Sequence, residues 1–282
     1  MQGVLWGTGM TNVVVTGSFD DLRVPHMRFL HEASRLGDLH VMLWSDAVAE
    51  ALQGAPPKFP EAERHYFMQA VRYVSNLVLV EHLSSASVLP DAGSVIPDIW
   101  AVNTQGDTAA RRRYCAGHGI ECRVFTETDL AGFPVPAENV YERPTDRKKV
   151  IVTGCYDWLH SGHIRFFEEV SEHGDLYVAV GNDANVRHLK GEGHPMFSQE
   201  LRRYMVQSIR FVSQAVITKG MGWMDAAPNV EEMHLDAYAV NEDGDRPEKR
   251  AFCEEHNLEY IVLRRKPREG LIQRSSTKLR GF

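Results

Sequence analysis

The chain has 282 residues, of which 43% are hydrophobic, enough for one large domain or two of ordinary size. A formal net charge of −7 and a pI near 6.0 provide no overall positive field for nucleic acid or an anionic membrane surface, so we expect neither as a partner. With no signal-like start, no apolar run of membrane length and no zinc-like spacing of the four cysteines, we expect a cytoplasmic protein without a metal site of its own.

The sequence contains two copies of one unit. The segment VVVTGSFD at Val13 returns as VIVTGCYD at Val150, and matched residues continue downstream with one single-residue slip in register. The matched pairs include Gly17 with Gly154, Gly37 with Gly174, Arg64 with Arg202, Asn103 with Asn241 and Cys115 with Cys253. A repeat of about 138 residues has the size of a small domain and is far longer than a solenoid unit. We therefore predict two tandem homologous domains.

A linker is expected between the two copies. From Thr126 to Lys149 the sequence is polar and contains proline, without apolar periodicity, which is typical of an exposed connection. We place the first domain at residues 10–135 and the second at residues 147–282.

Apolar runs and helical patterns alternate along the second copy. In chain order they read VIVTG, HIRFFEEVSEHG and DLYVAVGND, then ELRRYMVQSIRFV, QAVIT, DAYAVN and EYIVL. Runs this apolar, separated by helices, favour a parallel sheet that is covered on both faces. We predict an α/β fold of two tandem Rossmann-like, doubly wound parallel-sheet domains, in which ligands bind at the carboxyl ends of the strands near the switch point.

Two histidines stand where the first loop of the second copy becomes a helix. The sequence TGCYDWLHSGH contains His160 and His163, and Gly162 between them lets a phosphate approach closely. If the helix begins at Ser161, both rings and several free backbone N–H groups face one concavity, where the helix dipole favours an anion. Such a site suits phosphoryl or nucleotidyl transfer. The alternative is a pair of surface histidines near a helix cap.

Three motifs carry a resemblance to a known family. GCYDWLHSGH resembles the HxGH signature of the cytidylyltransferase-like nucleotidyltransferase superfamily. HLKGEGHPMFSQELRRYMVQSIRFV is similar to the family's Lys-Gly segment with its E-x-R helix, and RSSTKLR resembles its Ser/Thr-rich terminal signature. In this order the motifs cover nearly all of residues 148–280.

The resemblance implies specific roles. His160 and His163 would stabilise the transition state at the nucleotide phosphates, Lys190 would reach the substrate phosphates, and Arg202 would hold the second substrate's phosphate or the triphosphate. A turn or capping role for Asp157, and an N-cap role for the RSST segment, are the alternatives that we keep. The implied nucleotide-binding residues are Thr153, Gly154, Tyr156, Asp157, Gly162, Asn241, Asp245, Arg274, Ser275, Ser276 and Thr277.

The first copy departs from this pattern. Arg23 replaces His160, Pro25 replaces Gly162 and Gln53 replaces Lys190, whereas His26 and Arg64 remain. Proline also lacks the N–H that a phosphate could use. We predict a degenerate, non-catalytic first domain that packs against the second or completes a dimer-like interface. Alternatively, Arg23 substitutes for the lost imidazole and the first copy handles another substrate.

The resemblance implies transfer of a nucleoside monophosphate to a phosphorylated small alcohol or sugar, with release of pyrophosphate. The tandem layout resembles phosphoethanolamine cytidylyltransferase and favours CTP, whereas the RSST ending is similar to heptose-phosphate adenylyltransferases, which use ATP. A non-catalytic nucleotide-binding regulator is the alternative from another class. We expect Mg²⁺ to arrive with the nucleotide, and a homodimer or an intrachain pseudo-dimer to form.

Overall fold

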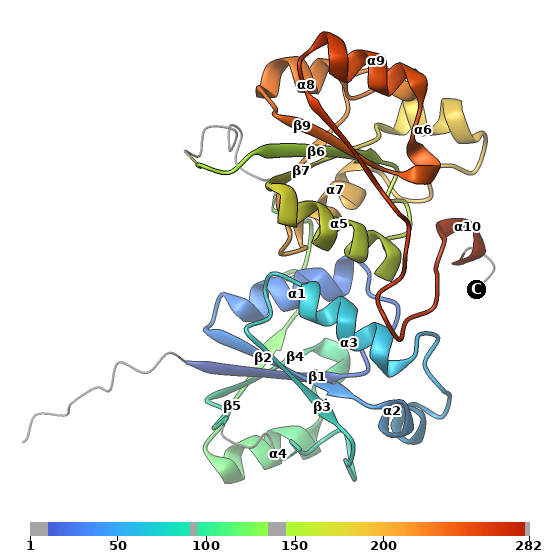
Figure 1. The fold of residues 1–282 in the computed structure, drawn as a ribbon. Coiled ribbons are helices and arrows are strands. Elements are labelled where there is room, and N and C mark those ends of the chain that lie inside the picture. Colours follow the sequence, from blue (N-terminus) through green and yellow to red (C-terminus); the bar gives the residue numbers. More distant parts are fainter. Residues whose placement is uncertain (1–10, 91–94, 135–144, 280–282) are drawn as a thin grey trace, which may run out of the picture. The chain divides into compact units, whose positions relative to one another are not determined.

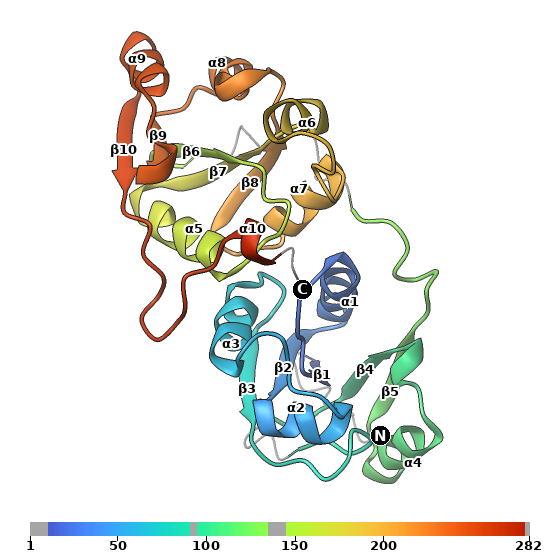
Figure 2. The same ribbon diagram turned by 90° about the vertical axis from the view of Figure 1, so that its right-hand side faces the viewer.

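The computed structural model describes residues 11–90, 95–134 and 145–279. The chain divides into two compact units, Met1–Phe133 and Pro134–Phe282, and each is described by itself (Figures 1 and 2). The ends that we predicted for the domains, at residues 10, 135 and 282, lie outside the described residues, as does the central part of the predicted linker.

The first unit is built on a parallel sheet of five strands in the order β3-β2-β1-β4-β5. The strands are β1 (Asn12–Gly17), β2 (Asp38–Trp44), β3 (Asn76–Val80), β4 (Ile99–Asn103) and β5 (Glu121–Phe125). The connecting segments are α1 (Val24–Ser34), α2 (Asp46–Gln53), α3 (Glu61–Ala70), the 3-10 turn η1 (Thr104–Gly106) and α4 (Ala109–His118). Helices α1 and α3 cover one face of the sheet, and α2 and α4 cover the other (Figure 1).

The second unit repeats this topology, with a parallel sheet in the order β10-β9-β6-β7-β8. Its strands are β6 (Lys149–Gly154), β7 (Asp175–Val180), β8 (Val212–Ile217), β9 (Ala237–Asn241) and β10 (Glu259–Leu263). Its helices are α5 (Ser161–His173), α6 (Asp183–Lys190), α7 (Gln199–Gln207), α8 (Ala227–Met233), α9 (Pro247–Glu255) and α10 (Ser276–Leu279), with 3-10 turns η3 (Gly222–Met224) and η4 (Glu242–Gly244).

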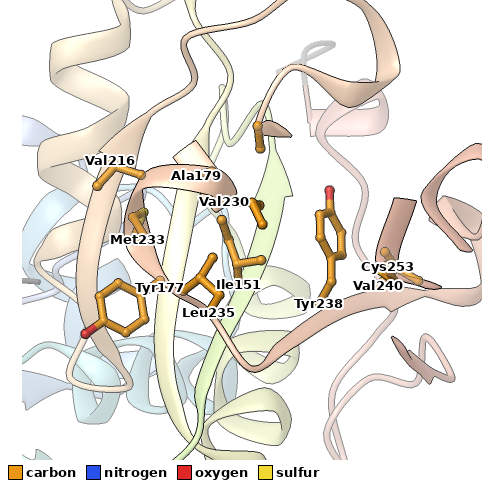
Figure 3. Close-up of a cluster of buried hydrophobic side chains, with 11 residues drawn as sticks. Ile151, Tyr177, Ala179, Val216, Val230, Met233, Leu235, Tyr238, Val240 and Cys253 are labelled. Carbon is orange, nitrogen blue, oxygen red and sulfur yellow. The ribbon is translucent and has the colours of Figure 1, made fainter. Parts of the chain in front are cut away.

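The burial of the strands explains the layered arrangement. Val150, Ile151 and Val152 of β6 are fully buried, so neither face of this strand meets solvent. On one face, Ile151 packs with side chains of β7, β8 and β9 and with the buried residues Val230 and Cys253 of α8 and α9 (Figure 3). Continuous apolar strands of this kind require helices on both sides. The predicted fold class, two tandem Rossmann-like units, is confirmed.

The order of the strands also fixes where a ligand can bind. In the second unit β6 lies between β7 and β9, so the chain leaves β6 in one direction and later returns on its other side. The loops that follow β6 and β9 diverge at this switch point, where open α/β sheets hold their ligands. Among the described helices of both units, none is long and apolar enough to cross a membrane.

Candidate functional site

A cavity of about 200 Å³ opens at the carboxyl ends of β6 and β9 in the second unit. Its walls come from the loop after β6, the first turn of α5, the end of α6, the η4 turn and the segment that follows β10. The residues predicted from the sequence that line it are Thr153, Gly154, Tyr156, His160, Gly162, His163, Lys190, Asn241 and Ser276.

His160 caps the helix that begins this site. It precedes α5, and its Nδ1 accepts a hydrogen bond of 3.1 Å from the backbone N–H of Gly162. Because Nδ1 is an acceptor, the proton of a neutral imidazole lies on Nε2. The side chain is only 3% exposed, and among the described residues no partner is in hydrogen-bonding reach of Nε2. The helix start therefore presents a buried N–H donor to the cavity.

His163 stacks on His160. The two ring centroids are 3.9 Å apart with an interplanar angle of 25°, and the edge of Tyr156 meets His163 at a centroid distance of 5.2 Å. Burial, assisted by the positive charges of Arg265 and Arg274, lowers the pKa of His160 to about 3. Burial, followed by the neighbouring His160, lowers the pKa of His163 well below its usual value. Both imidazoles are therefore neutral near pH 7 and act as hydrogen-bonding groups rather than as cations.

Other side chains supply the positive charge of the cavity. Lys190 lies at the end of α6, Lys249 in the first half of α9, and Arg265 in the segment after β10. Asp243 is the one carboxylate among the described lining residues, and it pairs with Arg265 at 2.5 Å. The excess of cations favours an anionic ligand.

Lys249 is a site residue that the sequence prediction missed. It is 7% exposed, and its Nζ lies 5.5 Å from the centroid of the Tyr238 ring. Burial lowers its pKa from the usual lysine value. The internal repeat could have indicated Lys249, because the matched position of the first unit is also a cation, Arg111. Its guanidinium lies 4.5 Å from the ring centroid of Trp100. A cation above an aromatic ring is thus present at the same place in both units.

Arg202 is not among the residues that line the cavity, and its predicted role stays a prediction. Its side chain is 1% exposed, and its guanidinium donates to the backbone carbonyls of Phe197, Cys155 and Gly181 at 2.6–2.9 Å. It also pairs with Asp183 at 2.7 Å. These contacts join α7 to the loop after β6 and to the start of α6. A phosphate contact would require their rearrangement.

The two predicted aspartates also lie off the cavity. Asp157 is buried and accepts hydrogen bonds from the backbone N–H groups of Met196 (2.8 Å) and Phe197 (3.0 Å). This geometry favours the turn role that we kept as an alternative. Asp245 binds Arg250 at 2.5 Å and accepts a 3.0 Å hydrogen bond from the hydroxyl of Tyr260. Both carboxylates bind partners that are not among the lining residues.

The terminal RSST segment contributes unequally. The Ser276 hydroxyl donates to the carbonyl of Trp158 at 3.3 Å and lines the cavity. Arg274 lines a small adjoining pocket together with Gly162 and Arg265. Ser275 is not among the lining residues. It directly precedes α10, and its carbonyl accepts a 3.2 Å hydrogen bond from the N–H of Leu279 at the end of that helix. The side chain of Thr277 lies outside the described part of the structure.

The corresponding place in the first unit is arranged differently. The Nδ1 of His26 accepts from the backbone N–H of Arg23 at 3.1 Å, and the guanidinium of Arg23 pairs with Asp21 at 2.6 Å. The Nε2 of Gln53 donates to the hydroxyl of Ser18 at 2.9 Å. These contacts differ from the stacked imidazole pair and the nearby lysine of the second unit, and they support a non-catalytic first unit, which stays a prediction.

The chain is an α/β protein of two repeated Rossmann-like units. The second unit has a cationic cavity and a neutral imidazole pair at its switch point. Residues 151–280 match the family model described as Cytidylyltransferase-like. The resemblance seen in the sequence motifs is thereby confirmed at the level of the family.

Comparison with individual proteins covers shorter segments. The chain is 37% identical over 81 residues to the bifunctional protein HldE of Campylobacter concisus (strain 13826), which is 28% of this chain and 17% of that protein. It is 44% identical over 85 residues to the bifunctional protein HldE of Campylobacter curvus (strain 525.92), 29% of this chain and 18% of that protein. The matched segments thus span less than a fifth of these relatives.

One solved structure is similar over a single domain's length. The crystal structure of the lipopolysaccharide core biosynthesis protein from Thermoplasma volcanium GSS1 is 25% identical, covering 42% of this chain and 96% of that one, with a TM-score of 0.33.

Proposed function

We propose that the second unit transfers a nucleoside monophosphate from a nucleoside triphosphate to the phosphate of a small phosphorylated alcohol or sugar, releasing pyrophosphate. One observation carries this proposal. The stacked, neutral His160 and His163 share a cavity with Lys190 at the first turn of α5. Hydrogen-bond donors, a helix start and cations in one concavity are what nucleotidyl transfer needs.

The charge states of the site suit the chemistry of this reaction. A phosphate oxygen of the second substrate attacks the α-phosphorus of the triphosphate, and the bond from that phosphorus to the bridging oxygen breaks, so that pyrophosphate leaves. The attacking group is already an anion and needs no general base. The Nε2–H of His160 would donate to an oxygen of the transferring phosphate, while Lys190 and Lys249 would balance its charge.

Magnesium enters as part of the same proposal. Asp243 is the one carboxylate among the described lining residues, and no group of three or more metal-ligating side chains occurs in the part of the chain that the structure describes. The donor set therefore fits a Mg²⁺ ion that takes most of its oxygen ligands from the nucleotide phosphates and water. Asp243 is the lining carboxylate that would help to hold it.

The nucleotide base separates two candidates. CTP is the first, supported by the family description and by the tandem layout. ATP with a sugar phosphate is the second, supported by the likeness of the Arg274–Thr277 segment to the ending of heptose-phosphate adenylyltransferases. Both donors place their phosphates at the same imidazole pair, so the choice of base leaves the proposed chemistry unchanged.

The test is pyrophosphate release by the full chain. CTP and ATP are each supplied with Mg²⁺ and with a panel of phosphorylated alcohols, sugars and phosphonates, and released pyrophosphate is measured. We expect release with one donor and one acceptor class, and its loss in His163→Ala. Nucleotide binding without release for any acceptor would instead identify the non-catalytic regulator, and absence of nucleotide binding would overturn the proposal.

A further inference from the structure

The first unit has a larger cavity at the place that matches the candidate site of the second. It measures about 600 Å³ and opens at the carboxyl ends of β1 and β4. A volume of this order is typical of small-molecule sites. Its wall includes Thr16, Gly17, Ala101, Val102 and Asn103, which match Thr153, Gly154, Ala239, Val240 and Asn241 of the other cavity. The strand-end half of the wall is therefore common to both units.

The other half of the wall has lost its positive charge. Gln53 lines the cavity where the second unit has Lys190. The charged residues among the described lining residues are Asp20 and Arg111, and each is already engaged. Asp20 accepts from the backbone N–H groups of Lys58 (2.7 Å) and Phe59 (3.1 Å).

Arg111 is occupied by the wall itself. Its guanidinium donates to the carbonyls of Gly106 and Ala86 and lies 4.5 Å from the ring centroid of Trp100. Burial lowers the pKa of His26, which keeps this imidazole neutral at pH 7. The net charge of the wall is close to zero, so a triphosphate would bring its negative charge to a cavity without compensating cations.

The wall of this cavity combines hydrogen-bonding side chains with aromatic rings. The indole Nε1 of Trp44 is buried, and among the described residues it has no acceptor, although Trp44 lines the cavity. Ser87, Asn103 and Gln105 add hydroxyl and amide groups. Phe19 and Phe29 add apolar faces, on which a flat ring can pack. An uncharged molecule with carbonyl or hydroxyl acceptors and one flat face matches this wall.

We propose that the first unit binds a nucleoside without phosphate groups, at the cavity between the ends of β1 and β4. That the ligand is uncharged follows from the wall itself. The choice of a nucleoside rests on the proposed function of the second unit, since both cavities share the strand-end half of the wall, which contains neither the imidazole pair nor Lys190. The first unit keeps this half and lacks the cationic part.

The test uses isothermal titration calorimetry on the full chain with cytidine and adenosine, and with CTP, ATP and glucose for comparison. Gln53→Trp places a bulky ring in the cavity from an exposed position at the end of α2. Trp44→Phe removes the indole N–H and keeps an aromatic ring. Lys190→Ala alters the matched position of the second unit. Thermal unfolding and pyrophosphate release are recorded for each variant.

We expect one of the two nucleosides to bind, with an affinity that Gln53→Trp lowers by at least about tenfold and Lys190→Ala leaves unchanged. Trp44→Phe should weaken binding by a smaller factor. Gln53→Trp should leave pyrophosphate release intact, so a failure of this proposal is distinguishable from a failure of the proposed function. No nucleoside binding at millimolar concentration, binding insensitive to Gln53→Trp, preference for a triphosphate in the first unit, or binding of glucose alone would each overturn it.

Discussion

Arg202 repeats the contacts of Arg64 in the other unit. In each unit the guanidinium donates at 2.6–2.9 Å to the carbonyl of a phenylalanine five residues earlier, to a carbonyl in the loop after the first strand, and to the aspartate that begins the helix after the second strand. The acceptors are Phe59, Ser18 and Asp46 in the first unit, and Phe197, Cys155 and Asp183 in the second. The first unit keeps these contacts although it lacks the imidazole pair and the lysine, so in both units they hold the loop after the first strand.

Arg202→Ala should therefore destabilise the second unit before it affects substrate affinity. Removing a buried guanidinium leaves several carbonyls and a carboxylate without their donor, which costs about 3–5 kcal/mol of unfolding free energy. Arg64→Ala is the matched control and should destabilise the first unit by a similar amount. Urea denaturation of both variants measures the loss. A raised KM for the phosphorylated substrate, with an unchanged denaturation midpoint, would instead support the substrate-binding role that the sequence predicts.

His163→Ala should reduce pyrophosphate release by at least about a hundredfold, the loss typical of removing one preorganised hydrogen-bonding group from a transition state. Its ring stacks on His160 and packs against Tyr156, so a small loss of stability is expected as well. His26→Ala, at the matched position of the first unit, should leave turnover intact. Steady-state rates of the two variants are compared at saturating nucleotide. An equally deep loss in His26→Ala would show that both units take part in the chemistry.

Much of the fold and part of the site could be predicted from the sequence, for physical reasons that individual residues make clear. The apolar run at Val150 specifies a strand that is covered on both faces, and Gly162 beside His160 specifies a helix start open to an anion. These are local properties. The motif resemblance predicts Arg202 as a phosphate ligand, whereas its burial follows from contacts across three elements that the sequence does not reveal.

Lys249 is a lining residue that the sequence analysis did not identify. It lies on α9, far along the chain from the imidazoles, and only the packing of β9 beside β6 brings it to the cavity. No spacing rule connects it with residues 160–163. The cation at the matched position of the first unit, Arg111, was the available signal, and it becomes informative once the aromatic residue beneath each cation is known.

The low pKa of His160 predicts an acid-sensitive second unit. In the folded state this pKa is lowered to about 3, chiefly by burial, whereas an unfolded histidine titrates near about 6.5. Below the pKa of the unfolded state, the unfolded chain binds a proton that the folded chain does not. The free energy of unfolding therefore decreases as the pH is lowered, by at most about 1.4 kcal/mol per pH unit for this group. The loss continues until the pH reaches the folded value.

His160→Gln should remove this part of the acid sensitivity. Urea denaturation is measured between pH 7.5 and pH 5 for the variant and for the unaltered chain. The difference between their unfolding free energies should be constant above the pKa of the unfolded histidine and shrink below it. His173→Gln is a suitable control, because His173 ends α5 without lining the cavity. Parallel pH profiles for His160→Gln and the unaltered chain would mean that folding does not shift the pKa of this imidazole.

Lys249→Met should lower pyrophosphate release about tenfold or more while leaving the unfolding free energy nearly unchanged. Methionine replaces the aliphatic stem above Tyr238 and removes a charge whose pKa burial already lowers, so the fold loses little. The transition state loses a cation that lines its cavity. Arg250→Met is the neighbouring control, because Arg250 is exposed and pairs with Asp245 off the cavity. Equal rates for Lys249→Met and the unaltered chain would show that this lysine serves the core alone, whereas a rate loss in the control would point to the α9 helix as a whole.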